Sequence, residues 1–161
     1  MENNKEFLPL FISLENKKVL VLGAGRIAFR KVSTVTPYKA NIKILTTKVV
    51  DPRFSDLILE NNLIKLSIGE FDRKFIKKEC LDSFLVILAT DNEKLNEELA
   101  SYCDKNNVLV NNITSKTEMN TRFPSILKQG DYTIGISANG DPKKSKALKN
   151  KLSSLDLGTI L

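Results

Sequence analysis

The sequence predicts an α/β fold in which a Rossmann-like parallel sheet is followed by a small antiparallel segment and a short C-terminal helix. Three observations carry this prediction. Up to residue 110, short apolar runs alternate with helix-length spacers, which is the pattern of strands buried on both faces of a parallel sheet. The first such run leads directly into a glycine loop, and after residue 111 the alternation gives way to a hairpin pattern.

The first strand and helix are predicted near the start of the chain. Residues 19–22 form a continuous apolar run, as expected of a buried strand. Residues 26–35 carry apolar side chains at helical spacing, and Pro37 ends this helix. Residues 42–45 then predict the second strand.

A second helix and a third strand are predicted next. Asp51 provides a good N-cap and Pro52 suits the first helical position, so the two predict a helix over 51–62. Residues 63–68 predict the third strand. The residues between it and the next strand suggest no element.

The most strongly apolar run, residues 84–89, predicts a central fourth strand. Thr90 or Asp91 is expected to cap a helix over 92–106, and residues 108–110 predict a fifth strand. Strands separated by helix-length spacers imply parallel pairing through right-handed crossovers.

After Asn111 the pattern changes to that of a hairpin and a helix. Residues 129–131 have the composition of a tight turn, and residues 132–137 alternate as a half-exposed strand does. Such a pair fits an antiparallel extension with an edge that can pair with a second subunit. A short basic helix is expected over 143–154, with Ala147, Leu148 and Leu152 on its apolar side.

Composition excludes several kinds of chemistry. The 161 residues include no His, no Trp and two Cys. Without imidazole, a Ser-His-Asp triad, a Cys-His nucleophile and a His-ligated metal are excluded. Cys80 and Cys103 lie far apart in the sequence without a CxxC motif, so we expect two reduced thiols and no metal site.

The net charge of +6 favours an anionic partner. A dinucleotide, a polycarboxylate and a nucleic acid all qualify, but charge is all that supports the nucleic acid, and the basic segment 141–151 is equally explained as a solvated helix face. No apolar run reaches the length of a membrane helix, and the first residues lack the basic-then-apolar order of a signal peptide. A cytoplasmic protein with no membrane partner is therefore expected.

Residues 23–28 match the G-x-G-x-x-A form of the dinucleotide-binding loop. In such a loop Gly23 permits the tight turn, Gly25 lets the backbone approach pyrophosphate, and Ala28 is the small residue where helix meets strand. The loop follows a predicted strand and opens a predicted helix, whose N-terminus attracts anions. We therefore favour dinucleotide binding over a purely structural turn.

Further candidate contacts end the second and fourth strands. The second strand ends in Thr46, Thr47 and Lys48 instead of the acidic residue that usually binds the ribose hydroxyls. Lys48 is compatible with a 2′-phosphate, so the residues leave NAD and NADP open. Ala89 and Thr90 end the fourth strand at the same edge of the sheet, where ligands of open α/β sheets bind.

Several blocks of sequence, taken in order, resemble a known family. The chain resembles the precorrin-2 dehydrogenase/sirohydrochlorin ferrochelatase family, the NAD-dependent module of siroheme synthases, over residues 7–152. The blocks that carry the resemblance are residues 9–11, 14–25 with Ala28, Arg30 and Lys31, then 84–92, 95–96, 109–111, 123–125 and 130–134.

The resemblance implies oxidation of precorrin-2 to sirohydrochlorin with NAD as hydride acceptor, in a homodimer formed through the segment after the Rossmann domain. Because the substrate is a polycarboxylate, the positive charge gains a purpose. The cofactor contacts that the resemblance implies are Gly23, Gly25, Arg26, Ile27, Thr47, Lys48, Ala89 and Thr90. The residues expected to contact the tetrapyrrole are Asn111, Ser137, Asn139, Lys143 and Lys144.

Two departures from the family pattern bear on catalysis. Thr114 stands where the family carries a catalytic aspartate, and a threonine hydroxyl cannot accept a proton near neutral pH. Glu118, Asp91 and the pair 111–112 are substitutes, although solvated loop residues explain each of them more simply. The family's C-terminal helical domain is expected to be largely missing. Metal insertion is therefore the less supported activity, and a catalytically degraded module that binds a tetrapyrrole or dinucleotide is the alternative.

The sequence pattern and the family resemblance together predict that the chain has three parts. Residues 1–112 are expected to form the NAD-binding Rossmann-like domain, residues 113–142 a dimerisation hairpin segment, and residues 143–161 a truncated C-terminal helical region.

Overall fold

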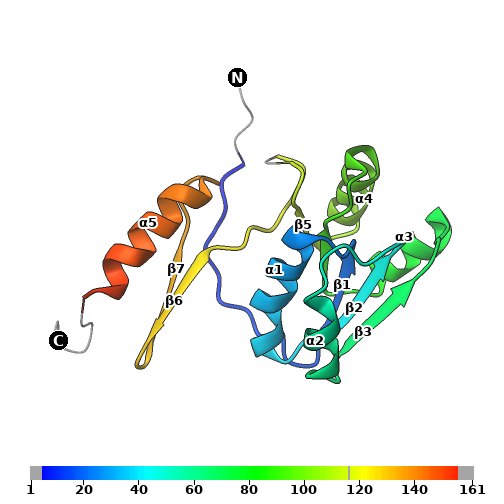
Figure 1. Ribbon diagram of the computed structural model, residues 1–161. Helices are drawn as coiled ribbons and strands as arrows, with labels where there is room; N and C mark the ends of the chain where they lie inside the picture. The colour runs from blue at the N-terminus through cyan, green and yellow to red at the C-terminus, as the bar shows by residue number, and fades with distance from the viewer. Residues whose placement is uncertain (1–4, 116, 156–161) are drawn as a thin grey trace. The chain divides into compact units, whose positions relative to one another are not determined.

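The computed structural model describes residues 5–115 and 117–155 (Figure 1). The first residues of the chain, on which the signal-peptide expectation rests in part, and residues 156–161 of the expected helical region lie outside the described residues. The chain divides into two compact units, residues 1–121 and 122–161. Across the described ranges, none of the helices is long and apolar enough to cross a membrane.

The first unit is built on a five-stranded parallel sheet in the order β3-β2-β1-β4-β5. This confirms the predicted strands, with β5 extending to Asn112. Leu22 of β1 lies beside Leu45 of β2 and Leu88 of β4, so these strands end together. The strands are β1 (Lys18–Leu22), β2 (Asn41–Thr46), β3 (Ile64–Ile68), β4 (Leu85–Leu88) and β5 (Leu109–Asn112).

Two helices, α1 (Arg26–Val35) and α2 (Phe54–Leu59), lie on one face of the sheet (Figure 1). A 3-10 turn, η1 (Thr36–Tyr38), ends α1 at the predicted proline. The prediction for the start of α2 is wrong. The Asp51 carboxylate does not cap a helix, because it binds the backbone N–H and the guanidinium of Arg53 instead, and the helix begins at Phe54.

The other face of the sheet carries α3 (Arg73–Leu81) and α4 (Glu93–Lys105) (Figure 1). The sequence analysis assigns no element to α3, although Asp72 caps this helix through the Phe75 N–H and its two buried side chains, Ile76 and Cys80, are four residues apart. For α4 the expected cap is wrong. Asn92 caps it in place of Thr90 or Asp91, since the Asn92 carboxamide oxygen accepts the Leu95 N–H at 3.0 Å.

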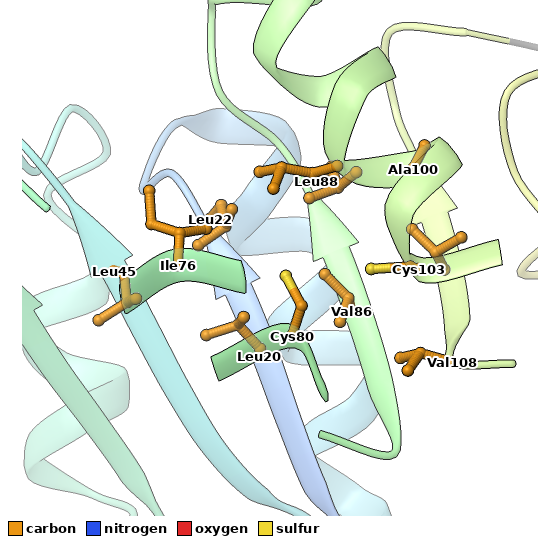
Figure 2. Packing of buried hydrophobic residues seen from close by; sticks show 12 residues of the cluster. Leu20, Leu22, Leu45, Ile76, Cys80, Val86, Leu88, Ala100, Cys103 and Val108 are labelled. Atoms are coloured by element: carbon orange, nitrogen blue, oxygen red, sulfur yellow. The ribbon is translucent and has the colours of Figure 1, made fainter. Parts of the chain in front are cut away.

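Aliphatic side chains and two thiols form the core between the sheet and this second pair of helices (Figure 2). Figure 2 shows Cys80 on α3 and Cys103 on α4 directed into the same cluster as Leu20 and Leu88. Both cysteines are free and fully buried. The hydrogen bond with Cys80, together with burial, raises the pKa of the Cys103 thiol, so this thiol is unreactive at neutral pH.

The second unit contains the antiparallel pair β6 (Ser125–Gln129) and β7 (Tyr132–Ile136), followed by α5 (Pro142–Ser153). This confirms the predicted hairpin, with its turn at Gly130 and Asp131, and the basic helix. Of the side chains predicted on the apolar side of α5, Leu152 is half-buried, on the same helix face as Ser145, whereas Ala147 and Leu148 are exposed. Leu148 is 48% exposed, whereas Ser145 is buried.

Candidate active site at the carboxyl edge of the sheet

The site begins where β1 and β4 end side by side. The chain leaves β1 toward β2 on one side while β4 lies on the other, and ligands of open α/β sheets bind at such a switch point. Gly23 follows β1 with φ +99°, and a Cβ atom there would lie only 2.3 Å from the Ala89 carbonyl oxygen. Glycine is therefore required for the loop to pass the end of β4.

Gly25 differs from Gly23 because nothing among the described residues would obstruct a side chain there. It is the N-cap of α1, with φ −91°, and a Cβ would meet no described atom within 4 Å. The space is left open beside the first N–H groups of a ten-residue helix that has no acidic residue in its first turn. Arg26 and Ile27 are exposed at this end. The cradle fits an anionic group such as pyrophosphate.

Contacts behind the loop hold it in place. The carbonyl oxygen of Ala24 accepts the N–H groups of Val50 and Asp51 at 3.0 and 3.1 Å. The Arg53 guanidinium lies over the Phe29 ring at 4.2 Å and hydrogen-bonds Asp51. This hydrogen bond holds the pKa of the Asp51 carboxyl below its usual value, and the Coulombic attraction of Arg26 adds to it. Asp51 is thus a structural anion with its charge already compensated.

The end of β2 supplies polar groups but no carboxylate. The Thr46 hydroxyl donates to the Lys48 carbonyl oxygen at 2.7 Å and closes a short turn. Thr47 and Lys48 are exposed after this turn. Since Leu45 and Leu22 are in register, these two side chains follow the strand next to the glycine loop.

A hydrogen-bond network joins the loops that follow β4 and β5. Asn96 of α4, which is fully buried, donates through Nδ2 to the Thr90 carbonyl oxygen at 3.0 Å and to Thr114 Oγ1 at 3.3 Å. The Thr90 hydroxyl donates to Asn96 Oδ1 at 2.7 Å. The Thr114 hydroxyl and its backbone N–H both donate to Asn112 Oδ1, at 2.8 and 3.1 Å. Thr90 and Thr114 are therefore held by one carboxamide.

Two amides at the end of β5 retain unused hydrogen-bonding capacity. Asn111 Nδ2 donates to the Thr121 carbonyl oxygen at 2.8 Å. Within the described part of the chain, Asn111 Oδ1 and Asn112 Nδ2 are buried without a partner. Unsatisfied buried polar atoms are uncommon and occur at functional sites.

The residues considered as replacements for the family's catalytic aspartate differ in burial. Asp91 and Glu118 are exposed, as solvated loop residues are, whereas Asn111 and Asn112 are buried. The described ranges contain no group of three or more His, Cys, Asp or Glu side chains that could hold a metal ion.

The residues expected to contact the tetrapyrrole fall in both units. Asn111 belongs to the first unit, at the carboxyl edge. Ser137 and Asn139, before α5, and Lys143 and Lys144, in its first turn, belong to the second unit, and all four are exposed. Asp141 in the same turn accepts the N–H groups of Lys143 and Lys144, at 2.9 and 3.1 Å, and so fixes the start of α5.

Asn96 is the site residue that sequence reasoning does not single out. The signal is present in the pattern, because Asn96 shares one face of α4 with Leu99, Ala100 and Cys103, all of which are buried. A carboxamide in an apolar stripe needs hydrogen-bond partners from elsewhere in the chain. Those partners, Thr90 and Thr114, become visible only in the folded structure.

Comparison with known proteins identifies the family. The family described as "Putative NAD(P)-binding" matches residues 10–125. The precorrin-2 dehydrogenase of Bacillus subtilis (strain 168) is 34% identical over 150 residues, which cover 92% of this chain and 88% of that protein. The chain belongs to the precorrin-2 dehydrogenase family.

Other members of this family are longer. The siroheme synthase of Blochmanniella floridana is 36% identical over 150 residues, 92% of this chain but 31% of that protein. The chain therefore spans about a third of the siroheme synthases it matches. A solved structure named "SirC, precorrin-2 dehydrogenase" superposes with a TM-score of 0.73 at 22% identity, covering 92% of this chain and 70% of that one, and shares the fold.

Proposed function

We propose that the protein oxidises precorrin-2 to sirohydrochlorin with NAD as the hydride acceptor, as a step in siroheme biosynthesis. The observation that carries the proposal is the glycine loop. Gly23 lies against the end of β4, and Gly25 leaves the helix N-terminus open beside it. Membership of the precorrin-2 dehydrogenase family supports the choice of substrate.

The chain's own residues bind and orient the reactants. The N–H groups at the start of α1 and the exposed Arg26 would hold the pyrophosphate, and the exposed Thr47 and Lys48 would contact the adenosine ribose. Ile27, Ala89 and Thr90 line the remainder of the dinucleotide site. When bound, NAD supplies the hydride acceptor. The protein's contribution is to hold the donor carbon close to it.

A group other than the Thr114 side chain must accept the proton that the oxidation releases. Oxidation of precorrin-2 releases a proton as well as a hydride, and the Thr114 hydroxyl cannot take that proton near neutral pH. Asp91 and Glu118 are exposed, so water next to the site is the acceptor that we propose. Orientation by the protein then provides most of the acceleration.

The basic first turn of α5 supports a polycarboxylate substrate. Lys143 and Lys144 are exposed, and their backbone N–H groups donate to the N-cap carboxylate of Asp141. We propose that these two ammonium groups, with Ser137 and Asn139, bind substrate carboxylates.

Turnover of precorrin-2 tests this function directly. We expect absorbance of reduced nicotinamide to rise when anaerobic precorrin-2 and NAD are mixed with the protein. Gly25→Asp, which puts a carboxylate at the pyrophosphate cradle, serves as the matched control and is expected to be inactive. Intact substrate in the presence of bound NAD would refute the proposed activity.

Thr114 favours a second candidate, a family member that binds a tetrapyrrole or dinucleotide without turning it over. The Thr114→Asp variant separates the two, because it restores a carboxylate at the position of the family's base. If the natural chain binds both ligands without turnover and Thr114→Asp oxidises the substrate, the second candidate is correct. If the natural chain turns over, it is excluded.

We further propose a homodimer formed through the second unit and a cytoplasmic location. Leu148 and Tyr132 are 48% and 37% exposed on α5 and β7, and a two-stranded sheet leaves both outer edges to pair. Sedimentation is expected to give about twice the chain's 18.1 kDa, and Leu148→Lys is expected to lower the dimer fraction. A monomer at all concentrations would contradict the proposed dimer.

The proposed cytoplasmic location is tested separately, by cell fractionation.

A further inference from the structure

We propose that Asn96 is a positioning residue that makes the hydroxyls of Thr90 and Thr114 hydrogen-bond acceptors toward the bound reactants. This inference rests on the function proposed above and assigns a role at the same site. It follows from which groups in the network can only donate and which can only accept.

Backbone groups fix the orientation of the Asn96 carboxamide. The Asn96 atom that lies 3.0 Å from the Thr90 carbonyl oxygen must be the nitrogen, because a carbonyl oxygen only accepts. The other amide atom is then the oxygen, and it lies 2.7 Å from Thr90 Oγ1. Since this oxygen cannot donate, the Thr90 hydroxyl must donate its proton to it.

The same reasoning fixes Asn112. The Thr114 backbone N–H only donates, so the Asn112 atom that lies 3.1 Å from it is the oxygen. The Thr114 hydroxyl lies 2.8 Å from that same oxygen and must also donate to it. Its own oxygen accepts the Asn96 Nδ2 group at 3.3 Å.

Both hydroxyl protons are therefore already used, and each hydroxyl oxygen keeps a lone pair. A hydroxyl has one donor and two acceptor positions. Thr114 accepts from Asn96, so one acceptor position remains on its oxygen among the described residues. Thr90 accepts from the Asn92 N–H at 3.2 Å and lies 3.3 Å from the Asn92 carbonyl oxygen, so its remaining acceptor position is more confined. Thr114 is exposed and Thr90 is half-buried, so a ligand can reach these lone pairs.

The ligand chemistry that fits is a hydrogen-bond donor, and both reactants carry N–H groups. A dinucleotide offers the carboxamide of its nicotinamide, and a tetrapyrrole offers ring N–H groups. A carboxylate or a phosphate oxygen, which only accepts, would meet another lone pair here and be repelled. The two hydroxyls therefore act as orienting acceptors, whereas anionic groups are bound at the start of α1.

The test compares single and double variants. We expect Thr114→Val and Asn96→Ala each to lower kcat about tenfold, the usual cost of one lost hydrogen bond that is stronger in the transition state. Because Asn96 acts through Thr114, the double variant is expected to be no slower than the worse single variant. Thr114→Ser, which keeps the hydroxyl, is expected to retain most activity.

A matched control separates this role from stability. Asn61→Ala removes a carboxamide that accepts the Leu63 N–H at 3.0 Å before β3, at the opposite edge of the sheet, and is expected to leave kcat unchanged. A hundredfold loss in the double variant, or an unchanged kcat in folded Asn96→Ala, would overturn the proposal. A change in the Kd of NAD points to the nicotinamide carboxamide as the N–H donor, and a change in the KM of precorrin-2 points to the tetrapyrrole.

A second measurement does not depend on turnover, so failure of the proposed function leaves the network testable. In the nuclear magnetic resonance spectrum of the natural chain, the Nδ2 protons of Asn96 are expected to exchange slowly with solvent. Thr114→Val is expected to shift one of them, and Asn61→Ala neither. Asn96 protons that exchange as fast as those of an exposed amide would refute the network itself.

Discussion

Gly23 and Gly25 serve different purposes although the loop pattern treats them alike. A Cβ at Gly23 would lie 2.3 Å from the Ala89 carbonyl oxygen, and its φ of +99° is a conformation that other residues rarely adopt. At Gly25 the φ is −91°, and the described residues leave the Cβ position open. The first glycine is needed for the protein's own packing, whereas the second leaves open the space in which we propose that the dinucleotide binds.

Alanine substitution separates these two roles. Gly23→Ala is expected to cost about 1–3 kcal/mol of unfolding free energy, because the clash with β4 adds to backbone strain. Gly25→Ala is expected to leave the unfolding free energy nearly unchanged and to weaken NAD binding. Urea denaturation and calorimetric titration with NAD measure the two effects. Equal destabilisation by both substitutions would contradict this assignment.

Lys31 on α1 makes stability depend on pH above neutrality. Burial, with a contribution from neighbouring Arg30, lowers its pKa from 10.5 to about 8. Between these values the unfolded chain keeps the proton that the folded chain has lost, so stability rises with pH. The gain relative to Lys31→Met between pH 7 and pH 10.5 is at most roughly 3 kcal/mol. Urea denaturation of both proteins across this range checks it, and a constant difference would exclude the shift.

At the scale of elements, Asn120 closes the exposed edge of β5. Its backbone N–H donates to the Val110 carbonyl oxygen at 3.1 Å, and its side-chain Oδ1 accepts the Val110 N–H at 2.7 Å. Its Nδ2 donates to the Val108 carbonyl oxygen at 3.0 Å. The backbone N–H and the carboxamide of Asn120 thus make the hydrogen bonds to β5 that a neighbouring strand would make. The polar sequence pattern between residues 112 and 122 does not predict these hydrogen bonds.

Removal of this carboxamide is expected to weaken the edge of the sheet. Asn120→Ala leaves the Val110 N–H without its acceptor, at a cost of about 1–3 kcal/mol. Asn120→Asp keeps the acceptor, but it replaces the Nδ2 donor to the Val108 carbonyl oxygen and to Asp104 Oδ1 with an oxygen that both repel, so its cost is expected to be at least as large. Urea denaturation and hydrogen exchange at the Val110 amide measure the effect. Unchanged exchange in Asn120→Ala would show that the contact does not protect the strand.

At the scale of the whole molecule, the net charge of +6 is expected to assist the capture of a polycarboxylate. Salt screens such attraction, so kcat/KM for precorrin-2 is expected to fall severalfold between about 10 and 150 mM salt while kcat stays constant. Lys143→Gln is expected to flatten this dependence. The control is Lys65→Gln, which removes the same charge from β3, an outer strand of the sheet. Equal effects of both variants would assign the attraction to net charge alone.

Local sequence patterns predict most of the sheet. They fail for the helix and the helix cap that depend on contacts formed only in the folded chain. The five parallel strands are predicted because buried strands need continuous apolar runs, and the glycine loop because its turn tolerates few other residues. The helix α3 is not predicted, because the short apolar stripe of Ile76 and Cys80 is hard to recognise before packing shows which residues are buried, even though Asp72 caps it. The cap expected at Asp51 fails because Arg53, two residues later, binds the carboxylate.

The sequence by itself determines the parallel sheet, the position of the glycine loop and the absence of imidazole chemistry, because each depends on residue types at short spacing. Only the tertiary structure decides that Asn96 joins Thr90 to Thr114 and that Gly23 meets Ala89. These contacts join residues separated by helices and strands. Local propensity does not encode them, and they arise only when parallel strands bring their carboxyl ends to one edge.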